Sequence, residues 1–182
     1  MKIVFLDRDG VLNEYPGDGD YVKTVKEMRL LPGALDAVKR LKDAGFRVYI
    51  ISNQACVGRG IITQVQLDEI TEKLLKAARV KEIKFDGIYY CTHAPDAKCE
   101  CRKPGTANIQ KVLKQLGTKI EFVQQGYFVG DTDKDIETGH KAGLKTILVQ
   151  TGRDSSRDIK NWAFRPHQVA RDLNQAVDII LS

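Results

Sequence analysis

The sequence predicts an α/β fold, a single Rossmann-like domain of three layers with a central, mostly parallel sheet and helices on both faces. Strand and helix patterns alternate almost from end to end, which is typical of βαβ units. Polar clusters follow several of the apolar runs, as they do at the carboxyl edge of such sheets. The length of 182 residues suits one sizeable core and leaves no room for a large cap domain.

The first half of the chain predicts three strands and two helices. Its short apolar runs predict strands at residues 3–6, 46–51 and 85–90. One helix opens at Pro32 and Gly33 and ends at Gly45. The other begins at a capping box formed by Thr63 and Gln66, which precede leucine and isoleucine residues at helical spacing.

The second half continues the alternation. Its patterns predict strands at residues 127–129 and 146–150, and helices at residues 109–116, before Thr146 and over residues 170–181. Residues 13–28 are predicted to form a polar flap that is too short to be a domain. We therefore expect residues 1–182 to form one domain.

The composition excludes little beyond a membrane protein. Lys and Arg number 29 and Asp and Glu 24, an excess of five that could favour anionic partners such as nucleic acid or phosphorylated metabolites. The basic residues are spread along the chain without interleaved aromatics, however, which is more typical of a solvated face. No apolar run approaches the ~20 residues that span a bilayer, and Asp7 interrupts the first run before it could serve as a secretory signal. We expect a cytoplasmic protein with no membrane contact.

An acidic pair, Asp7 and Asp9, follows the first predicted strand. Side chains alternate along extended backbone, so both carboxylates should face one way and Arg8 the other. Carboxylates that converge in a cleft repel each other, and they are tolerated where a cation or a chemical task needs them. The alternative is a surface turn in which Asp and Gly10 simply end the strand.

Other polar motifs should reach the same edge of the sheet. The second strand is followed by Ser52-Asn53-Gln54, the fourth by residues 130–135, and Arg102-Lys103 precede a helix in the remaining gap. Each has an ordinary alternative when taken alone. Ser52 could cap a turn, Asp131 could be a helix N-cap, and Arg102 could be a surface charge.

Four metal-ligand side chains fall within eleven residues, at Cys91, His93, Cys99 and Cys101. A Cys₃His set is a common closed tetrahedral zinc site, and in a cytoplasmic protein such clustering indicates metal rather than disulfides. The alternative is a loop of reduced thiols. Four protein ligands leave zinc no open position, so we expect a structural Zn²⁺ in a loop at residues 91–101. The fourth cysteine, Cys56, is assigned no role.

Together these motifs resemble those of the haloacid dehalogenase superfamily of phosphatases, and more narrowly its capless, zinc-containing branch. The resemblance covers nearly the whole chain. It implies a Mg²⁺-dependent phosphomonoester hydrolase that acts through an aspartyl-phosphate intermediate. It further implies a small phosphorylated metabolite as substrate, with the 7-phosphate of a heptose 1,7-bisphosphate expected to be removed.

The resemblance also implies roles for individual residues. Asp7 is the expected nucleophile, and Asp9 is the acid that protonates the leaving alcohol and then the base that activates water. Asp7, Asp131 and the main-chain carbonyl of Asp9 are expected to hold Mg²⁺. Ser52 is expected to hydrogen-bond the transferring phosphoryl group and Lys103 to neutralise it.

Substrate contacts are implied at the rim and beside the second strand, at Asp20, Tyr21, Asn53, Gln54 and Arg102. We expect a monomer that binds no nucleic acid. Three alternatives stay open. Histidinol phosphate is a rival substrate, and a DNA-end phosphatase of capless design is another. A zinc-stabilised, basic nucleic-acid or protein-interaction module would explain the cysteines but gives no reason for the aspartates to cluster.

Overall fold

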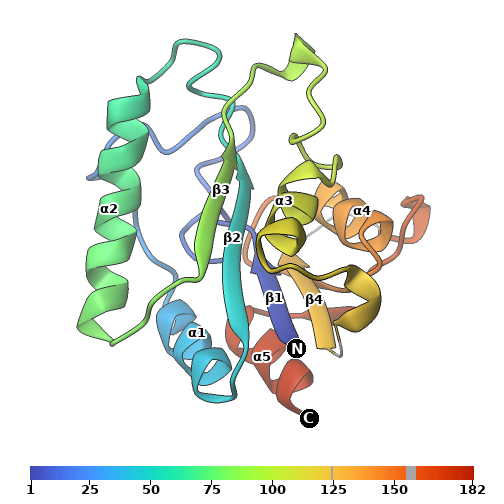
Figure 1. Ribbon diagram of the computed structural model, residues 1–182. Helices are drawn as coiled ribbons and strands as arrows, with labels where there is room; N and C mark the ends of the chain where they lie inside the picture. Colours follow the sequence, from blue (N-terminus) through green and yellow to red (C-terminus); the bar gives the residue numbers. More distant parts are fainter. Residues whose placement is uncertain (124, 155–158) are drawn as a thin grey trace.

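The computed structural model describes residues 1–123, 125–154 and 159–182 and is built on one sheet (Figure 1). Within these residues the sheet has six strands in the order β3-β2-β1-β4-β5-β6, and each neighbouring pair is parallel. The strands are β1 Lys2–Leu6, β2 Arg47–Asn53, β3 Gly87–Cys91, β4 Gln125–Gly130, β5 Lys145–Val149 and β6 Gln168–Ala170.

The strand order places β1 at a topological switch point, because the chain leaves β1 toward β2 on one side and pairs it with β4 on the other. Leu6, the last residue of β1, lies opposite Ile50 and Val129. The residues that follow these three positions therefore reach the same carboxyl edge of the sheet. Ligands of open α/β sheets bind in the crevice at such a point.

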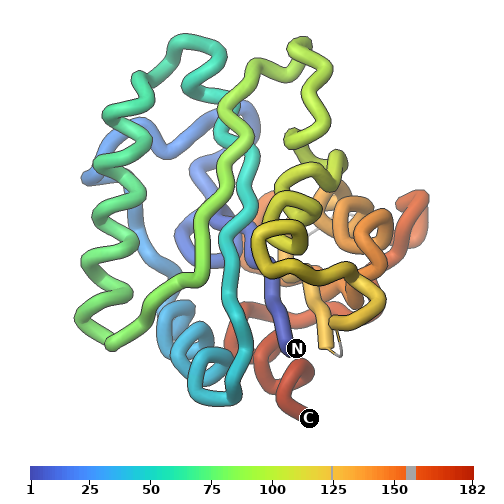
Figure 2. The backbone as a smooth tube through the Cα atoms, viewed as in Figure 1, coloured from blue at the N-terminus to red at the C-terminus, as the bar shows by residue number. Residues whose placement is uncertain are grey.

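Helices cover both faces of the sheet (Figure 2). One core joins the sheet to α1 Ala34–Asp43, α2 Gln64–Val80 and α5 Leu173–Leu181. On the opposite face lie α3 Ala107–Gln115 and α4 Asp133–Lys141. The predicted three-layer, Rossmann-like α/β fold is confirmed, and the described residues include no separate cap domain.

The helix boundaries follow local chemistry. The predicted capping box of Thr63 and Gln66 is present at the start of α2. The prediction of one terminal helix over residues 170–181 is wrong at its beginning. Gln168–Ala170 forms strand β6 beside β5, and α5 starts only after Asp172, whose side chain accepts the main-chain N–H of Gln175.

The flap, residues 13–28, contains no helix or strand, as the polar sequence predicts. It is fastened at its first residue by isolated bridges that join Asn13 to Asp9 and Leu30. Val22 and Met28 are buried in the larger core. Among the described residues, no helix is both long and apolar enough to reach across a bilayer.

Candidate active site

A pocket opens at the carboxyl edge of the sheet, where the predicted motifs meet. Fifteen of the described residues line it, and they come from the end of β1, the flap, the end of β2, the segment before α3, the start of α4 and the segment after β5. Of the predicted catalytic and substrate-binding residues, the lining includes Asp7, Asp9, Asp20, Tyr21, Ser52, Asn53, Arg102 and Lys103. Asp131, predicted to bind Mg²⁺, also lines it.

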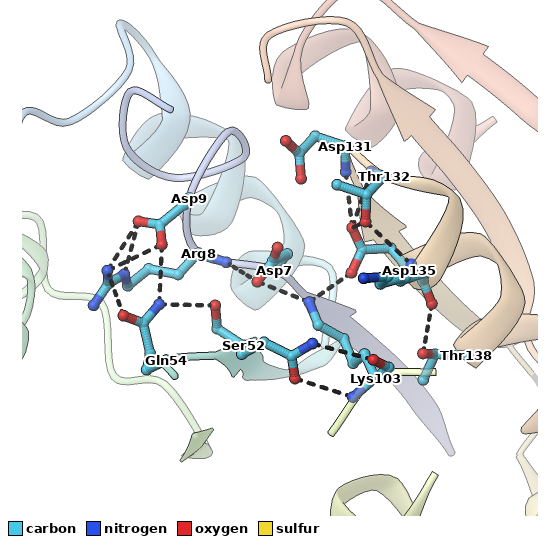
Figure 3. Close-up of polar contacts among 12 residues, drawn as sticks. Asp7, Arg8, Asp9, Ser52, Gln54, Lys103, Asp131, Thr132, Asp135 and Thr138 are labelled. Carbon is cyan, nitrogen blue, oxygen red and sulfur yellow. Dashed lines mark hydrogen bonds and ion pairs between the residues drawn. The ribbon is translucent and has the colours of Figure 1, made fainter. Parts of the chain in front are cut away.

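The Lys103 ammonium lies between two carboxylates at the bottom of this pocket (Figure 3). Its Nζ is 2.9 Å from Asp7 Oδ1 and 2.5 Å from Asp135 Oδ1. The Lys103 side chain is only 3% exposed, and burial alone would lower its pKa, but Asp135 and Asp7 raise it above the usual value. Lys103 is therefore a fixed positive charge beside Asp7.

Asp135 holds Lys103 because its other oxygen is anchored to the protein. Oδ2 accepts hydrogen bonds from the main-chain N–H groups of Asp131 and Thr132 and from the Thr132 hydroxyl, at 3.2, 3.0 and 2.7 Å. Gly130 leaves the room for it, since a Cβ there would come within 2.2 Å of the Asp135 Cβ. The N-cap of α4 is Thr132, so Asp131 is not the capping residue.

Three buried carboxylates gather at the bottom of the pocket, where Asp7 and Asp131 line it and Asp135 lies behind them. Oxygen atoms of Asp7, Asp131 and Asp135 all lie within 4.8 Å of one another. Burial raises the pKa of Asp7 to about 6, with Asp135 adding to the effect and Lys103 opposing it. Burial, Asp135 and Asp7 also raise the pKa of Asp131 well above its ordinary value. Such crowding of like charges fits a site for a hard divalent cation with oxygen ligands.

The segment after β5, which the sequence analysis did not single out, forms a cradle for Asp131. The main-chain N–H of Arg153 donates to Asp131 Oδ2 at 2.7 Å. A Cβ at Gly152 or Gly10 would lie 2.0 or 2.4 Å from the same oxygen, so glycine is required at both positions. The Thr151 hydroxyl joins the two sides by donating to the Gly10 carbonyl at 2.6 Å. The sequence could have indicated this segment as part of the site, because it follows a predicted strand that ends at the same edge of the sheet.

Asp9 lines the pocket with Asp7, but Arg8 does not point away from it. The Arg8 guanidinium donates to Asp9 Oδ1 from both Nε and Nη2, at 3.0 and 2.9 Å (Figure 3). The alternation rule fails here because β1 ends at Leu6 and the chain turns, with the Arg8 carbonyl accepting the N–H of Leu12. The fully buried Arg8 therefore lies beneath Asp9 and compensates its charge.

The three residues at the end of β2 have different environments. Asn53 is bonded to the main chain of Lys103, accepting its N–H at 3.0 Å and donating to its carbonyl at 3.2 Å. Gln54, predicted to bind substrate, is fully buried and is not among the lining residues. Its Nε2 donates to Asp9 Oδ2 at 2.9 Å and to Ser52 Oγ at 3.2 Å. Because the chain turns inward after Asn53, Gln54 lies behind the pocket and supports Asp9 and Ser52 instead.

The rim carries the other predicted substrate contacts. Asp20 Oδ1 accepts the Lys23 ammonium at 2.8 Å, and the Tyr21 hydroxyl accepts Arg59 Nη1 at 3.4 Å. Arg102 Nη1 is buried without a hydrogen-bond partner among the described residues. A buried, unpaired guanidinium nitrogen in a pocket wall is a donor available to a ligand.

The predicted zinc ligands converge at one point beside the pocket. The Cys91 sulfur is 3.4 Å from that of Cys99, and His93 Nδ1 is 3.3 Å from the Cys101 sulfur. All four ligand atoms lie within 4.8 Å of one another. Sulfur ligands around a tetrahedral zinc ion are about 3.8 Å apart, so the cluster has the size and chemistry of a Cys₃His zinc site.

The loop at residues 91–101, which contains this cluster, is tied to neighbouring segments by main-chain hydrogen bonds. Gln54 N–H donates to the Cys91 carbonyl and Gly58 N–H to the Thr92 carbonyl, each at 2.8 Å. Gly58 allows this contact, because a Cβ there would lie 2.4 Å from the Ala94 nitrogen. Since Arg102 and Lys103 follow Cys101 directly, the loop that gathers the cysteines also determines where these two cations lie.

Comparisons with known proteins agree with this site. Residues 100–176 match the HAD-hydrolase-like family model. The chain is 35% identical to the D-glycero-D-manno-heptose-1,7-bisphosphate 7-phosphatase of Chlorobaculum tepidum, over 97% of this chain and 92% of the relative. It is 31% identical to the D-glycero-beta-D-manno-heptose-1,7-bisphosphate 7-phosphatase of Escherichia coli K12, over 97% and 94%.

A solved structure is equally similar. The D,D-heptose 1,7-bisphosphate phosphatase of B. bronchiseptica, complexed with magnesium and phosphate, superposes with a TM-score of 0.89 at 31% sequence identity. The alignment covers 100% of this chain and 98% of that one. The chain therefore belongs to the heptose-1,7-bisphosphate 7-phosphatase family of haloacid dehalogenase-like hydrolases, and it is a phosphatase.

Proposed function

We propose that this protein hydrolyses the 7-phosphate of D-glycero-D-manno-heptose 1,7-bisphosphate. The observation that carries the proposal is the Lys103 ammonium bound between Asp7 and Asp135, with the Asp131 carboxylate beside them. This arrangement presents a nucleophilic carboxylate, a cation and a second carboxylate to one phosphoryl group. The names of the relatives supply the substrate.

Asp7, Asp131 and the Asp9 main-chain carbonyl would hold Mg²⁺. The buried carboxylates Asp7 and Asp131 fit such an ion because burial and neighbouring carboxylates raise the pKa of both, against the opposing effect of Lys103. The similar structure from B. bronchiseptica is described as a magnesium complex. When bound, Mg²⁺ offsets the negative charge of the phosphate and of the attacking carboxylate.

In the first step the Asp7 carboxylate attacks phosphorus, and the bond between phosphorus and the sugar oxygen breaks. Asp9 carries the proton that this oxygen takes up, a form of catalysis that contributes about 10²- to 10⁴-fold. The product left on the protein is an aspartyl phosphate, which divides one difficult hydrolysis into two easier reactions. Lys103 and Ser52 stabilise the phosphoryl group as it moves.

In the second step Asp9 takes a proton from water, which attacks the aspartyl phosphate and releases inorganic phosphate. This step needs the carboxylate form of Asp9. In the ligand-free protein, the Asp9 carboxylate accepts hydrogen bonds from Arg8, Asn13 and Gln54. These donors also aim Asp9 at the pocket.

The Cys₃His cluster is proposed to hold a structural Zn²⁺ that fixes the segment leading to Arg102 and Lys103. The closeness of its four ligand atoms supports this assignment. We further propose that residues 1–182 act as one domain with the zinc loop at 91–101. In this proposal the protein is a cytoplasmic monomer whose partner is a sugar bisphosphate and not nucleic acid.

The substrate is tested by steady-state kinetics with heptose 1,7-bisphosphate and histidinol phosphate in the presence of Mg²⁺. We expect a kcat/KM for the heptose bisphosphate at least ~100-fold higher than for histidinol phosphate, since only the former carries two phosphates across a pocket lined by several cations. The opposite preference, or no release of phosphate from the heptose, would contradict the proposal.

A further inference from the structure

The pocket is lined by cationic side chains in addition to Lys103, the one that lies beside Asp7. Its lining includes four cationic side chains, those of Arg102, Lys103, Lys134 and Arg153. Lys103 is fixed at the reacting end by Asp7 and Asp135. We propose that Arg153 recognises the second, non-reacting phosphate of a bisphosphate substrate, an inference that rests on the function proposed above.

Arg153 extends from the acidic cluster to the flap. Its main-chain N–H donates to Asp131 Oδ2 at 2.7 Å, whereas its guanidinium Nε lies 3.1 Å from Asp18 Oδ1 in the flap. The backbone of the residue is therefore fixed at the reacting end, and its charged group is at the rim. A phosphate attached to the far end of a substrate would meet this guanidinium after its reacting phosphate had reached Lys103.

The present partner of Arg153 is readily exchanged. The side chains of Arg153 and Asp18 are 41% and 69% exposed, and ion pairs this exposed contribute little to stability. Asp18 Oδ1 keeps a second partner, the Tyr15 hydroxyl at 2.9 Å, if Arg153 leaves it. A phosphate dianion offers the guanidinium two oxygens at once, which a shared carboxylate oxygen does not. In the ligand-free protein, the Asp18 carboxylate thus occupies the place on Arg153 that the second phosphate would take.

The test compares Arg153→Gln with the wild type on two substrates that share a reacting end, heptose 1,7-bisphosphate and heptose 7-phosphate. The readout is the ratio of their kcat/KM values. We expect the substitution to lower this ratio about 10- to 100-fold, the effect of losing one charged hydrogen-bond pair. The main-chain N–H that supports Asp131 stays in place in this variant.

Two further variants distinguish binding of the second phosphate by Arg153 from a purely structural role, in which its ion pair with Asp18 only holds the flap in place. Asp18→Asn breaks the same ion pair but keeps the cation, so it should leave the ratio unchanged or raise it. Arg79→Gln removes one charge near the C-terminal end of α2, where Arg79 pairs with Glu72, and controls for net charge. If Asp18→Asn reproduces Arg153→Gln, or if Arg153→Gln lowers both kcat/KM values equally, the inference is wrong.

A second pair of substrates, glucose 1,6-bisphosphate and glucose 6-phosphate, tests the role of Arg153 separately from the proposed heptose substrate. Activity on the glucose pair without activity on the heptose pair would refute the proposed function, while the glucose ratio would still decide the role of Arg153. A wild-type protein that hydrolyses the heptose bisphosphate but prefers neither bisphosphate over its monophosphate would refute the role of Arg153 while the proposed function would stand.

Discussion

At the residue scale, the site depends on buried polar side chains that have no contact with the pocket. Gln54 is the clearest case, because it is fully buried yet joins Asp9, Ser52 and Arg8 through one amide group. Its Oε1 accepts from Arg8 Nη2 at 3.0 Å while its Nε2 donates to the other two. Gln54 therefore orients both Asp9, the proposed acid–base residue, and Ser52, the proposed phosphate-binding hydroxyl.

Gln54→Met, which keeps the length of the side chain but removes its hydrogen bonds, should lower kcat about 10- to 100-fold with little change in KM. The reason is that a misplaced Asp9 loses part of the 10²- to 10⁴-fold that general acid–base catalysis supplies. Steady-state kinetics with the heptose bisphosphate gives both constants. An increase in KM with an unchanged kcat would instead support the direct substrate contact that the sequence predicts.

At the element scale, the loop at residues 91–101, the proposed zinc loop, connects strand β3 to the segment that carries Arg102 and Lys103. Cys91 ends β3, and its carbonyl accepts the N–H of Gln54. The Cys101 carbonyl accepts Asn108 Nδ2 of α3 at 3.4 Å. The loop thus determines the position of Lys103 relative to Asp7, although none of its cysteines lines the pocket.

Removing zinc with a chelator and then restoring Mg²⁺ should lower kcat/KM by more than about tenfold, since a displacement of ~1 Å in a catalytic group can cost ~100-fold. Added Zn²⁺ should restore activity. Cys99→Ser should lose the zinc measured by elemental analysis, whereas Cys56→Ser, which changes a cysteine outside the cluster, should retain it. Full activity and unchanged thermal stability without zinc would show that the loop does not support the site.

The strands also differ in how clearly the sequence predicts them. Apolar runs identify β1 and β2 because every residue from Ile3 to Leu6 is buried, as are most residues of β2. Strand β6 is not predicted from the sequence, because it has three residues and only Ala170 among them is buried. The local signal for the α5 helix therefore extends over it.

Site residues are predictable where a side chain carries the chemistry and follows a strand. Asp7 and Asp131 meet that condition, and Lys103 is predictable because it precedes a helix that begins at the same edge. Gly152 contributes because it has no Cβ, and Arg153 contributes its main-chain N–H. Neither contribution can be recognised from the residue type in a sequence. The direction of Arg8 depends on the turn after Leu6, a tertiary feature outside the reach of a two-residue period.

At the scale of the whole molecule, one topological feature assembles the site. Strand β1 lies between β2 and β4, so the ends of three parallel strands deliver Asp7, Ser52 and Asp131 to a single crevice. The segment before α3 adds Lys103, and the segment after β5 adds Arg153. With no cap domain among the described residues, the flap and Arg102, which directly follows the loop at residues 91–101, line the pocket beyond the strand ends.

The most direct test of covalent catalysis is mass spectrometry of Asp9→Asn protein quenched during turnover of 4-nitrophenyl phosphate. This substrate leaves without needing a proton, so its phosphoryl group should transfer to the variant, whereas hydrolysis of the intermediate lacks its base. We expect one phosphoryl group on the peptide that contains Asp7, and none in the Asp7→Asn, Asp9→Asn double variant. Hydrolysis with no phosphoryl group on Asp7, or turnover that persists in Asp7→Asn, would contradict the account.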